Sequence, residues 1–405
     1  MTRLAIVLLW FGWMACTGAA LAAAPLMSTF KPTADVYPQY FAIEQAADRA
    51  IYVGGNEELL RFDGVRWLRI AAPGPIRALS RQDDRIWAGG YNALGYLVRE
   101  ADGTERFVDV MPQFRARLGN RDVADVWHAL VTPDGIYFAA LRDLFHVSRD
   151  GKALQHWFHD GRFGAIAWFQ GRLLVQFRGK GLSVRQGDAF QLLAGTESLA
   201  DALVLGAVEH EPGQLLLWGH GLPLSTWDGS ALTPAAPWRG QTSDNGEYSR
   251  AVALGEGRVA FGGSNGALTV IDFRAHRETS IPVGGGFMSG VMRDQDGALW
   301  TINSLQLVRL AWPPAWRVYE AADGVEGLVQ HIGLPRGSRE AVNPEHHTHE
   351  EGLHASPLAG LTGVSEGRVP PALFEPFPGT GPPPGAAEAS TPTGLPTIFP
   401  VTTAP

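Results

Sequence analysis

The chain has 405 residues, of which 45% are hydrophobic and 18% are charged, and its net charge is −8 at pH 7. This length and composition fit a globular protein with a large buried core. The mildly acidic balance argues against a nucleic-acid-binding protein, because such proteins usually present a basic face.

The first 24 residues contain the three parts of a secretory signal peptide. Arg3 provides a positive charge, residues 4–14 form an apolar core, and residues 20–22 have the Ala-x-Ala pattern of a cleavage site. We therefore predict a signal peptide over residues 1–24 and export to the periplasm. An uncleaved anchor is the less favoured alternative, because the apolar run is short for a membrane span. A lipoprotein modified at Cys16 is disfavoured too, because residues 13–15 make a poor lipobox.

Cys16 is the only cysteine, so the cleaved chain would contain none. A chain without cysteine tolerates an oxidising compartment without needing disulfides. No other segment of the sequence is long and apolar enough to cross a membrane, so we expect no membrane span after cleavage of the signal peptide.

A short apolar phrase recurs seven times after the signal peptide, at a mean step of about 41 residues. Its apolar residues alternate or form blocks, and they lack the 3.6-residue spacing of a helical repeat. A period near 40 residues with short strands is typical of a β-propeller with one four-stranded blade per repeat. We therefore predict an all-β fold over residues 25–332, a seven-bladed β-propeller with four-stranded antiparallel blades. The copies begin at Ile51, Ile86, Ile136, Leu173, Leu215, Val259 and Leu299.

Each repeat can be divided into four expected strands. Asp-Gly pairs such as Asp296-Gly297 mark tight hairpin turns, because these turns need a positive φ that glycine accepts without strain. Most of the tryptophans fall on these strands, where we expect them to fill the wedges between blades. In the second repeat the expected strands cover residues 76–79, 85–89, 94–98 and 106–110, and in the third 126–131, 136–139, 143–147 and 153–157.

The propeller pattern ends near Ile332. Residues 316–319 are expected to close the seventh blade, and residues 322–332 resemble the first strand of an eighth unit. The strand that latches the ring is expected from residues 30–43 or is absent. The last 73 residues hold 14 of the 28 prolines, so we predict a disordered tail over 333–405.

Two origins compete for this tail. It is either a natural extension or the product of a shifted reading frame after an insertion or deletion. We favour the frameshift, because 30 arginines against 3 lysines indicate GC-rich DNA. Shifted frames of such DNA tend to be rich in proline, glycine and alanine.

Three segments together resemble the two-component regulator propeller family: residues 160–175, 294–300 and 319–332. Repeats of that family typically contain a Leu-Trp pair followed by a Gly-Thr step. Residues 51–67 and 86–97 are similar to the first blades of such sensors, and the similarity covers about 37–332. Several copies lack the Gly-Thr step.

The resemblance implies a function. In that family the propeller is a periplasmic input domain, commonly followed by a β-sandwich module, a membrane helix, and a histidine kinase or diguanylate cyclase. We find none of these outputs in the sequence. We therefore expect a truncated ligand-sensing region of a bacterial signal-transduction protein, without catalysis of its own. Expected partners are a small polar ligand or sugar, with a homodimer through downstream modules as one option, and no nucleic acid.

A secreted propeller enzyme acting on glycans and a periplasmic protein-interaction scaffold are the alternatives. Asp294 and Asp296 are similar to the Asp-box turn of sialidase-like propellers, but that turn is a folding element. The spacing of His349, Glu350 and His354 is one residue too long for a zinc-binding H-E-x-x-H helix. We expect no catalytic residue, no metal and no cofactor. Clustered carboxylates at the channel mouth would favour the enzyme, an apolar exposed rim the scaffold, and an aromatic-lined polar pocket the sensor.

Propellers usually bind ligands at one mouth of the central channel, on loops that enter or leave the inner strands. The candidates for ligand contact combine aromatic faces with hydrogen-bonding groups. Blade packing or a solvated loop is the alternative role for each of them. The candidates are Arg77, Tyr91, Asn92, Asp125, Trp127, Tyr248 and Arg250.

Overall fold

A computed structural model describes residues 24–32, 39–56, 58–119, 121–239, 248–304, 306–313 and 317–318. The chain divides into two units, residues 1–319 and 320–405, and every described residue belongs to the first. Most of the expected signal peptide, the expected eighth unit and the expected tail therefore lie outside the described residues.

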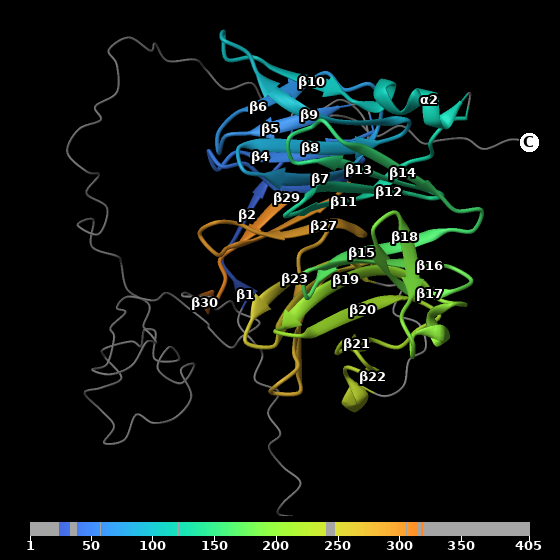
Figure 1. The fold of residues 1–405 in the computed structure, drawn as a ribbon. Helices are drawn as coiled ribbons and strands as arrows, with labels where there is room; N and C mark the ends of the chain where they lie inside the picture. Colours follow the sequence, from blue (N-terminus) through green and yellow to red (C-terminus); the bar gives the residue numbers. More distant parts are fainter. Residues whose placement is uncertain are drawn as a thin grey trace, which may run out of the picture. The chain divides into compact units, whose positions relative to one another are not determined.

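Seven four-stranded antiparallel sheets follow one another along the chain (Figure 1), which confirms the seven-bladed propeller. Blade 1 contains β3 (Tyr40–Gln45), β4 (Ile51–Gly55), β5 (Leu59–Phe62) and β6 (Trp67–Ile70). Blade 2 contains β7 (Ile76–Gln82), β8 (Arg85–Gly90), β9 (Ala93–Arg99) and β10 (Glu105–Asp109). Blade 3 contains β11 (Val126–Thr132), β12 (Gly135–Ala140), β13 (Asp143–Ser148) and β14 (Leu154–Phe158).

The later blades repeat this plan. Blade 4 contains β15 (Phe163–Phe169), β16 (Arg172–Phe177), β17 (Gly181–Gln186) and β18 (Ala189–Leu192). Blade 5 contains β19 (Leu203–Glu211), β20 (Gln214–His220), β21 (Ser225–Trp227) and β22 (Leu232–Pro234). Blade 6 contains β23 (Tyr248–Gly255), β24 (Arg258–Gly263), β25 (Ala267–Asp272) and β26 (Arg277–Pro282). Blade 7 contains β27 (Met288–Arg293), β28 (Leu299–Asn303), β29 (Leu307–Leu310) and, from the other end of the chain, β2 (Met27–Phe30).

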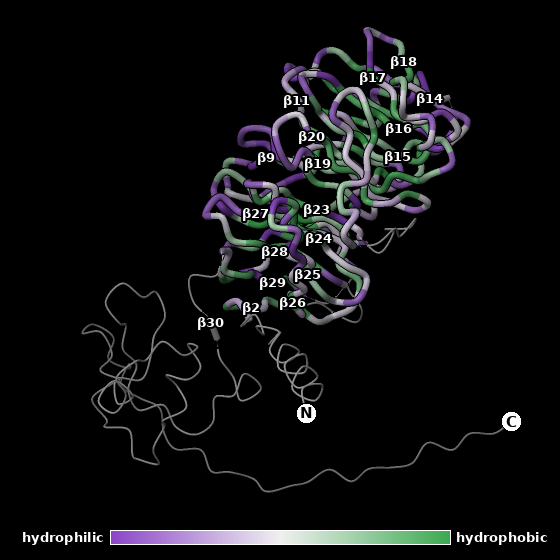
Figure 2. Tube along the Cα trace, turned by 90° about the horizontal axis from the view of Figure 1, so that it is seen from below, coloured by the Kyte–Doolittle hydropathy of each residue, from purple (hydrophilic) through white to green (hydrophobic). Residues whose placement is uncertain are grey.

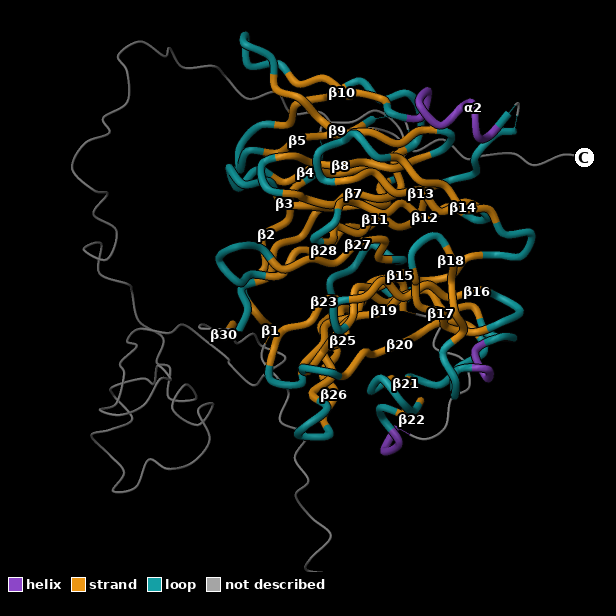
Figure 3. The backbone as a smooth tube through the Cα atoms, viewed as in Figure 1, coloured by secondary structure: helices purple, strands orange, loops and turns teal. Residues whose placement is uncertain are grey.

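The described helices are short (Figure 3), and none is long and apolar enough to cross a membrane. They are the 3-10 turns η1 (Met111–Phe114), η2 (Glu197–Leu199) and η3 (Pro237–Arg239), and the α-helix α2 (Arg115–Leu118).

The first strands of the seven blades form a closed ring. Each contacts the first strands of the two neighbouring blades, and β27 contacts β3. The expected Asp-Gly turns are present as well: Gly229 has φ 100° and Gly297 has φ 91°, the left-handed region that favours glycine.

The ring is latched by β2, which is a correction to the sequence-based expectation. Residues 316–319 were expected to close the seventh blade, but its fourth strand is β2, antiparallel to β29 with Ser28 opposite Arg309. Arg317–Val318 (β30) pairs instead with Ala24–Pro25 (β1) in a separate two-stranded ladder. The latch therefore comes from residues just after the predicted signal peptide, and only its last residue, Phe30, falls in the expected range 30–43.

Seven clusters of buried apolar side chains occupy the described part of the chain, one between each pair of neighbouring blades. Figure 2 shows the hydrophobic residues along the strands and the hydrophilic ones mainly on the loops. Trp87, Trp218, Trp227 and Trp300 are buried in these clusters, as expected of blade-packing tryptophans. Trp127 differs, because 38% of it is exposed.

Candidate functional site

The innermost strand of every blade has an irregular register near its start. At each of these places the pairing with the second strand skips forward, the signature of a β-bulge, so that an extra residue has no partner of its own. Bulges re-aim side chains, and six of the seven skipped residues line the mouth of the channel. The skipped residues are Phe41, Arg77, Trp127, Gly164 (with Ala165), Leu205, Ser249 and Ser289.

The skipped residues of blades 1 to 3 form a compact cluster. The Arg77 guanidinium lies 3.8 Å from the centre of the Phe41 ring and 5.6 Å from that of Trp127. It also pairs with Asp125 (Nε to Oδ1, 3.0 Å) and donates to the Asn56 side chain (2.7 Å). Arg77 is therefore held by a carboxylate, an amide and an aromatic face, which fills this side of the mouth.

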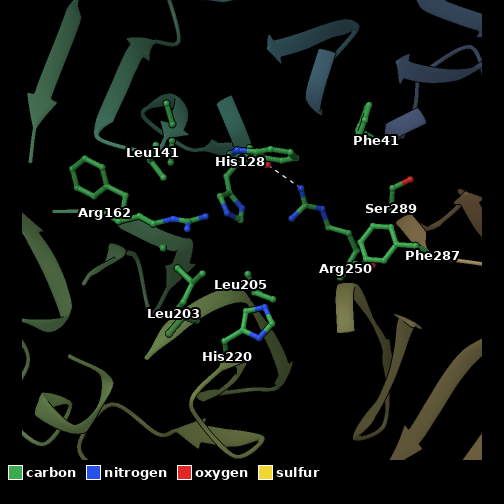
Figure 4. Close-up of a pocket in the computed structure, with 17 residues that line it drawn as sticks. Phe41, His128, Leu141, Arg162, Leu203, Leu205, His220, Arg250, Phe287 and Ser289 are labelled. Carbon is green, nitrogen blue, oxygen red and sulfur yellow. Dashed lines mark hydrogen bonds between the residues drawn. The ribbon is translucent and has the colours of Figure 1, made fainter. Parts of the chain in front are cut away.

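The skipped residues of blades 4, 6 and 7 are small, and a cavity of about 320 Å³ lies beside them (Figure 4). At Gly164 an added Cβ would lie 2.9 Å from the Val204 carbonyl oxygen and 1.9 Å from the Gln176 side-chain oxygen, and the fixed backbone atom favours glycine there. The hydroxyls of Ser249 and Ser289 are used locally: Ser249 donates to the Met288 carbonyl, and Ser289 to the Tyr40 carbonyl at 2.5 Å. Described residues from every blade except the second line this cavity.

The described lining is cationic and aromatic, and it contains no aspartate or glutamate. Arg250 donates to the backbone carbonyl of Trp127 at 2.9 Å. Arg162, just before β15, makes no side-chain hydrogen bond or ion pair with any described residue. Exposed aromatic faces complete the lining: Phe287 is 51% exposed and Trp127 38%.

Burial sets the protonation of the groups in the lining. It lowers the pKa of His128 to about 3, with smaller contributions from the positive charges of Arg250 and Arg162. Burial also lowers the pKa of both arginines, but a guanidinium stays protonated in proteins. At neutral pH the cavity therefore holds the positive charges of Arg162 and Arg250 and the neutral imidazole of His128, and the His220 side chain lines it as well.

A second cavity of about 380 Å³ lies deeper in the channel. It shares Trp127, His128 and Arg250 with the first cavity. Glu44 is the acidic residue in its described lining, and burial raises the pKa of that carboxyl. Arg250 and His128 therefore lie at the boundary between the mouth cavity, whose described lining has no carboxylate, and a deeper cavity of mixed charge.

The seven sequence-predicted residues have different surroundings. Trp127 and Arg250 line the mouth cavity, and Arg77 and Asp125 form the adjoining ion pair. Tyr248 is 3% exposed and packs in the core between blades 5 and 6.

The other two candidates lie on a loop beside the channel. The Asn92 side chain donates to Asp122 at 2.8 Å and accepts from the Val123 amide at 3.3 Å. Tyr91 is 49% exposed, and its backbone forms an isolated bridge with Asp125. Neither Tyr91 nor Asn92 lines either cavity.

Sequence reasoning missed Arg162, His128 and Phe287. His128 and Arg250 both directly follow a skipped residue, so a shared position relative to the bulge could have linked them. The bulge itself has no sequence signature that we recognised. Among the described residues, no group of histidine, cysteine, aspartate and glutamate side chains could hold a metal ion.

No protein-family model and no curated protein matches the chain. Solved structures do. The extracellular domain of the proposed hybrid two-component system BT4673 from B. thetaiotaomicron superposes with a TM-score of 0.57 at 14% identity, over 71% of this chain and 40% of that one. The corresponding domain of BT3049 from the same organism gives 0.56 at 11% identity, over 76% and 45%. The WD40 propeller domain of Doa1 gives 0.51 at 10% identity, over 73% and 98%.

This chain thus spans about two fifths of the length of the BT4673 domain. At such identities the likeness concerns the fold, and the same fold serves unrelated functions. The fold implied by the sequence resemblance is confirmed: the chain is a seven-bladed β-propeller with structural neighbours among the extracellular domains of two-component systems.

Proposed function

We propose that this chain is the ligand-sensing propeller of an exported bacterial signal-transduction protein. A small ligand binds in the mouth cavity and biases the packing of the propeller against downstream modules or a second protomer. The observation that carries the proposal is the cavity itself, a concave site with exposed aromatic faces and with the Arg162 guanidinium, which makes no hydrogen bond to a described residue. Two neighbours that are extracellular domains of two-component systems support it, as does the predicted signal peptide.

The alternative functions find less support in this site. A glycan-cleaving propeller would need carboxylates at the mouth, and the described lining of the mouth cavity has none. A scaffold would present a contiguous apolar rim. The large apolar residues exposed outside the cavity in the described chain are instead spread over several blades: Val65 and Leu68 on blade 1, Tyr91 on blade 2, Phe158 on blade 3, Leu192 on blade 4, and Leu26 and Met27 at the latch.

A melting-temperature screen of the purified full chain against sugars, amino acids and organic acids tests the proposal. We expect one class to raise the melting temperature, because a ligand that binds only the folded state stabilises it. Trp127→Ala should weaken binding of that ligand at least about tenfold in calorimetry, since buried aromatic contacts commonly contribute more than 1.4 kcal/mol.

Trp157→Ala is the matched control. Trp157 lies on the outer strand of blade 3, where its ring packs against Phe190 at 5.5 Å, and it lines neither cavity. Its loss should leave affinity unchanged. A screen in which no class stabilises the chain, or equal affinities for the two tryptophan variants and the wild type, would contradict a sensing role for this cavity.

A further inference from the structure

We infer that the mouth cavity selects a small organic acid, with its carboxylate held by Arg162 and Arg250. The inference rests on the proposed function and names the chemical class of its ligand. The body of the ligand is a single ring that packs against Trp127 and Phe287.

The two arginines converge from different blades. Arg162 enters from the start of blade 4 and Arg250 from the inner strand of blade 6. Figure 4 shows their guanidinium groups on opposite sides of the His128 ring, both directed into the cavity. Both positive charges act on the His128 position, so a carboxylate bound in the cavity beside that ring would be attracted by both arginines, and guanidinium-carboxylate pairs are among the strongest hydrogen-bonded contacts in proteins.

These guanidinium groups have spare donors. Each guanidinium carries five N–H donors. Arg162 uses none of them on a described residue, and Arg250 uses one group, on the Trp127 carbonyl. Other partly buried arginines of the chain are paired, as Arg77 is with Asp125 and Arg61 is with Asp48. Desolvated charges without a counterion are costly, so an anionic ligand would offset the cost.

The positive charge of the cavity is local, because the chain as a whole carries −8. His128 adds no charge, since its pKa lies at about 3. It offers one donor and one acceptor, which suits a hydroxyl or an amide on the ligand. Anion selectivity therefore comes from the two arginines, while His128 contributes neutral hydrogen bonds.

The size of the cavity limits the ligand. A volume of about 320 Å³ is at the lower end for small-molecule sites. It accommodates one ring with substituents and excludes a long oligosaccharide. The exposed faces of Trp127 and Phe287 can stack on an aromatic ring or on the C–H face of a sugar. An acidic sugar and an aromatic acid share the required chemistry, a carboxylate on a single ring with a face that can stack.

Calorimetry on the purified full chain with two matched pairs of probes tests the inference. Galacturonate is compared with galactose, and benzoate with benzamide, so each pair differs in the negative charge. We expect at least one acid to bind at least tenfold more tightly than its neutral partner, with an affinity that falls as salt is added. Galacturonate binding alone would indicate an acidic sugar, and benzoate binding alone an aromatic acid.

Arg162→Gln and Arg250→Gln should each weaken binding of the acid at least tenfold. Glutamine is shorter than arginine and loses the bond to the Trp127 carbonyl, but that carbonyl is partly exposed, so Arg250→Gln should still fold, and thermal melts check this. Arg277→Gln is the control, because Arg277 is exposed on β26, the fourth strand of blade 6, and lines neither cavity.

Three results would overturn the organic-acid class: a neutral probe that binds as tightly as its acid, unchanged affinity in both glutamine variants, or no binding of either acid at about 10 mM, ten times a Kd of 1 mM. A neutral ligand whose binding is lost in Trp127→Ala would refute the acid and leave the sensing function standing. The sensing function itself fails only when the broad melting screen also finds no ligand.

Discussion

Arg77 and Arg250 show how two arginines at the same channel mouth acquire different roles. Arg77 is the skipped residue of its strand and is held by Asp125, Asn56 and the Phe41 ring. Arg250 directly follows a skipped residue and contacts a single carbonyl. The first is a structural part of the wall, and the second is available to a ligand. The sequence does not separate them, because Asp125 lies 48 residues from Arg77 in the chain.

His128 should make the stability of the protein sensitive to acid. Its pKa is about 3 in the folded chain and 6.5 in its ordinary state, so between these values the unfolded chain binds a proton that the folded chain does not. The free energy of unfolding should therefore fall as the pH drops from 6.5 toward 3. One such proton contributes up to about 1.4 kcal/mol per pH unit.

Denaturant melts of wild type and His128→Gln across pH 4–7 measure this effect. The variant should show a shallower decline, although some slope remains because burial also lowers the pKa of His146 and His210. His276→Asn on an exposed turn is the control, and asparagine tolerates its φ of 50°. If the free energy of unfolding fell equally with pH in the wild type and in His128→Gln, the acid sensitivity would not come from His128.

The seam between blades 7 and 1 is the element on which ring closure depends. Gln295 bridges it through its amide to the Gln45 side chain and through its own side chain to the Ala46 carbonyl, both at 2.8 Å. Phe30, at the end of β2, packs against Phe62 of blade 1 at 4.8 Å and Trp300 of blade 7 at 5.6 Å. This strand of four residues thus joins blades 7 and 1 through the packing of one aromatic side chain.

Phe30→Ala should lower the melting temperature. Loss of a fully buried phenylalanine costs about 3–5 kcal/mol, and we expect about 2 kcal/mol for this partly buried ring. That corresponds to a decrease of several degrees. Leu26→Ala is the matched control, because Leu26 adjoins the same strand and is 52% exposed. Similar melting temperatures for the two variants would mean that β2 stabilises the ring through its backbone hydrogen bonds alone and that the Phe30 side chain contributes little.

The strands of blades 2 and 3 were predicted to within about three residues, since alternating apolar residues and Asp-Gly turns are local signals. The latch was predicted only in part: an N-terminal strand within 30–43 was one of the two expectations, and β2 overlaps that range at Phe30 alone. Residues 27–30 are mostly exposed and lack an apolar pattern, and their partner strand lies at the other end of the described chain. Of the residues that line the mouth cavity, the sequence analysis predicted only Trp127 and Arg250 as ligand contacts. Arg162 and His128 were not predicted, because the β-bulges that direct side chains into the channel mouth depend on the backbone register, which the sequence pattern does not reveal.

At the scale of the whole molecule, the cavity exists only while the ring is closed. Phe287 and Ser289 belong to one side of the seam and Phe41 to the other, and all three line the cavity. The latch strand β2 lines neither cavity. An opened seam would therefore separate cavity walls although no lining residue had changed. The affinity of the cavity is then coupled to the stability of a strand that does not touch the ligand.

A double substitution, Ser28→Pro with Thr29→Pro, tests this coupling. Hydrogen-bonded and non-bonded pairs alternate in an antiparallel ladder, so two successive prolines must remove a ladder bond. Hydrogen exchange should accelerate in β27, β28 and β3, while β15 and β16 keep their protection. Affinity for galacturonate or benzoate, whichever the wild type binds, should fall in proportion to the fraction of closed rings, about tenfold if one ring in ten stays closed. Lys31→Pro, just beyond β2, should change neither quantity. Unchanged affinity together with accelerated exchange at the seam would show that the cavity keeps its walls in an unlatched ring, and would confine the role of β2 to stability.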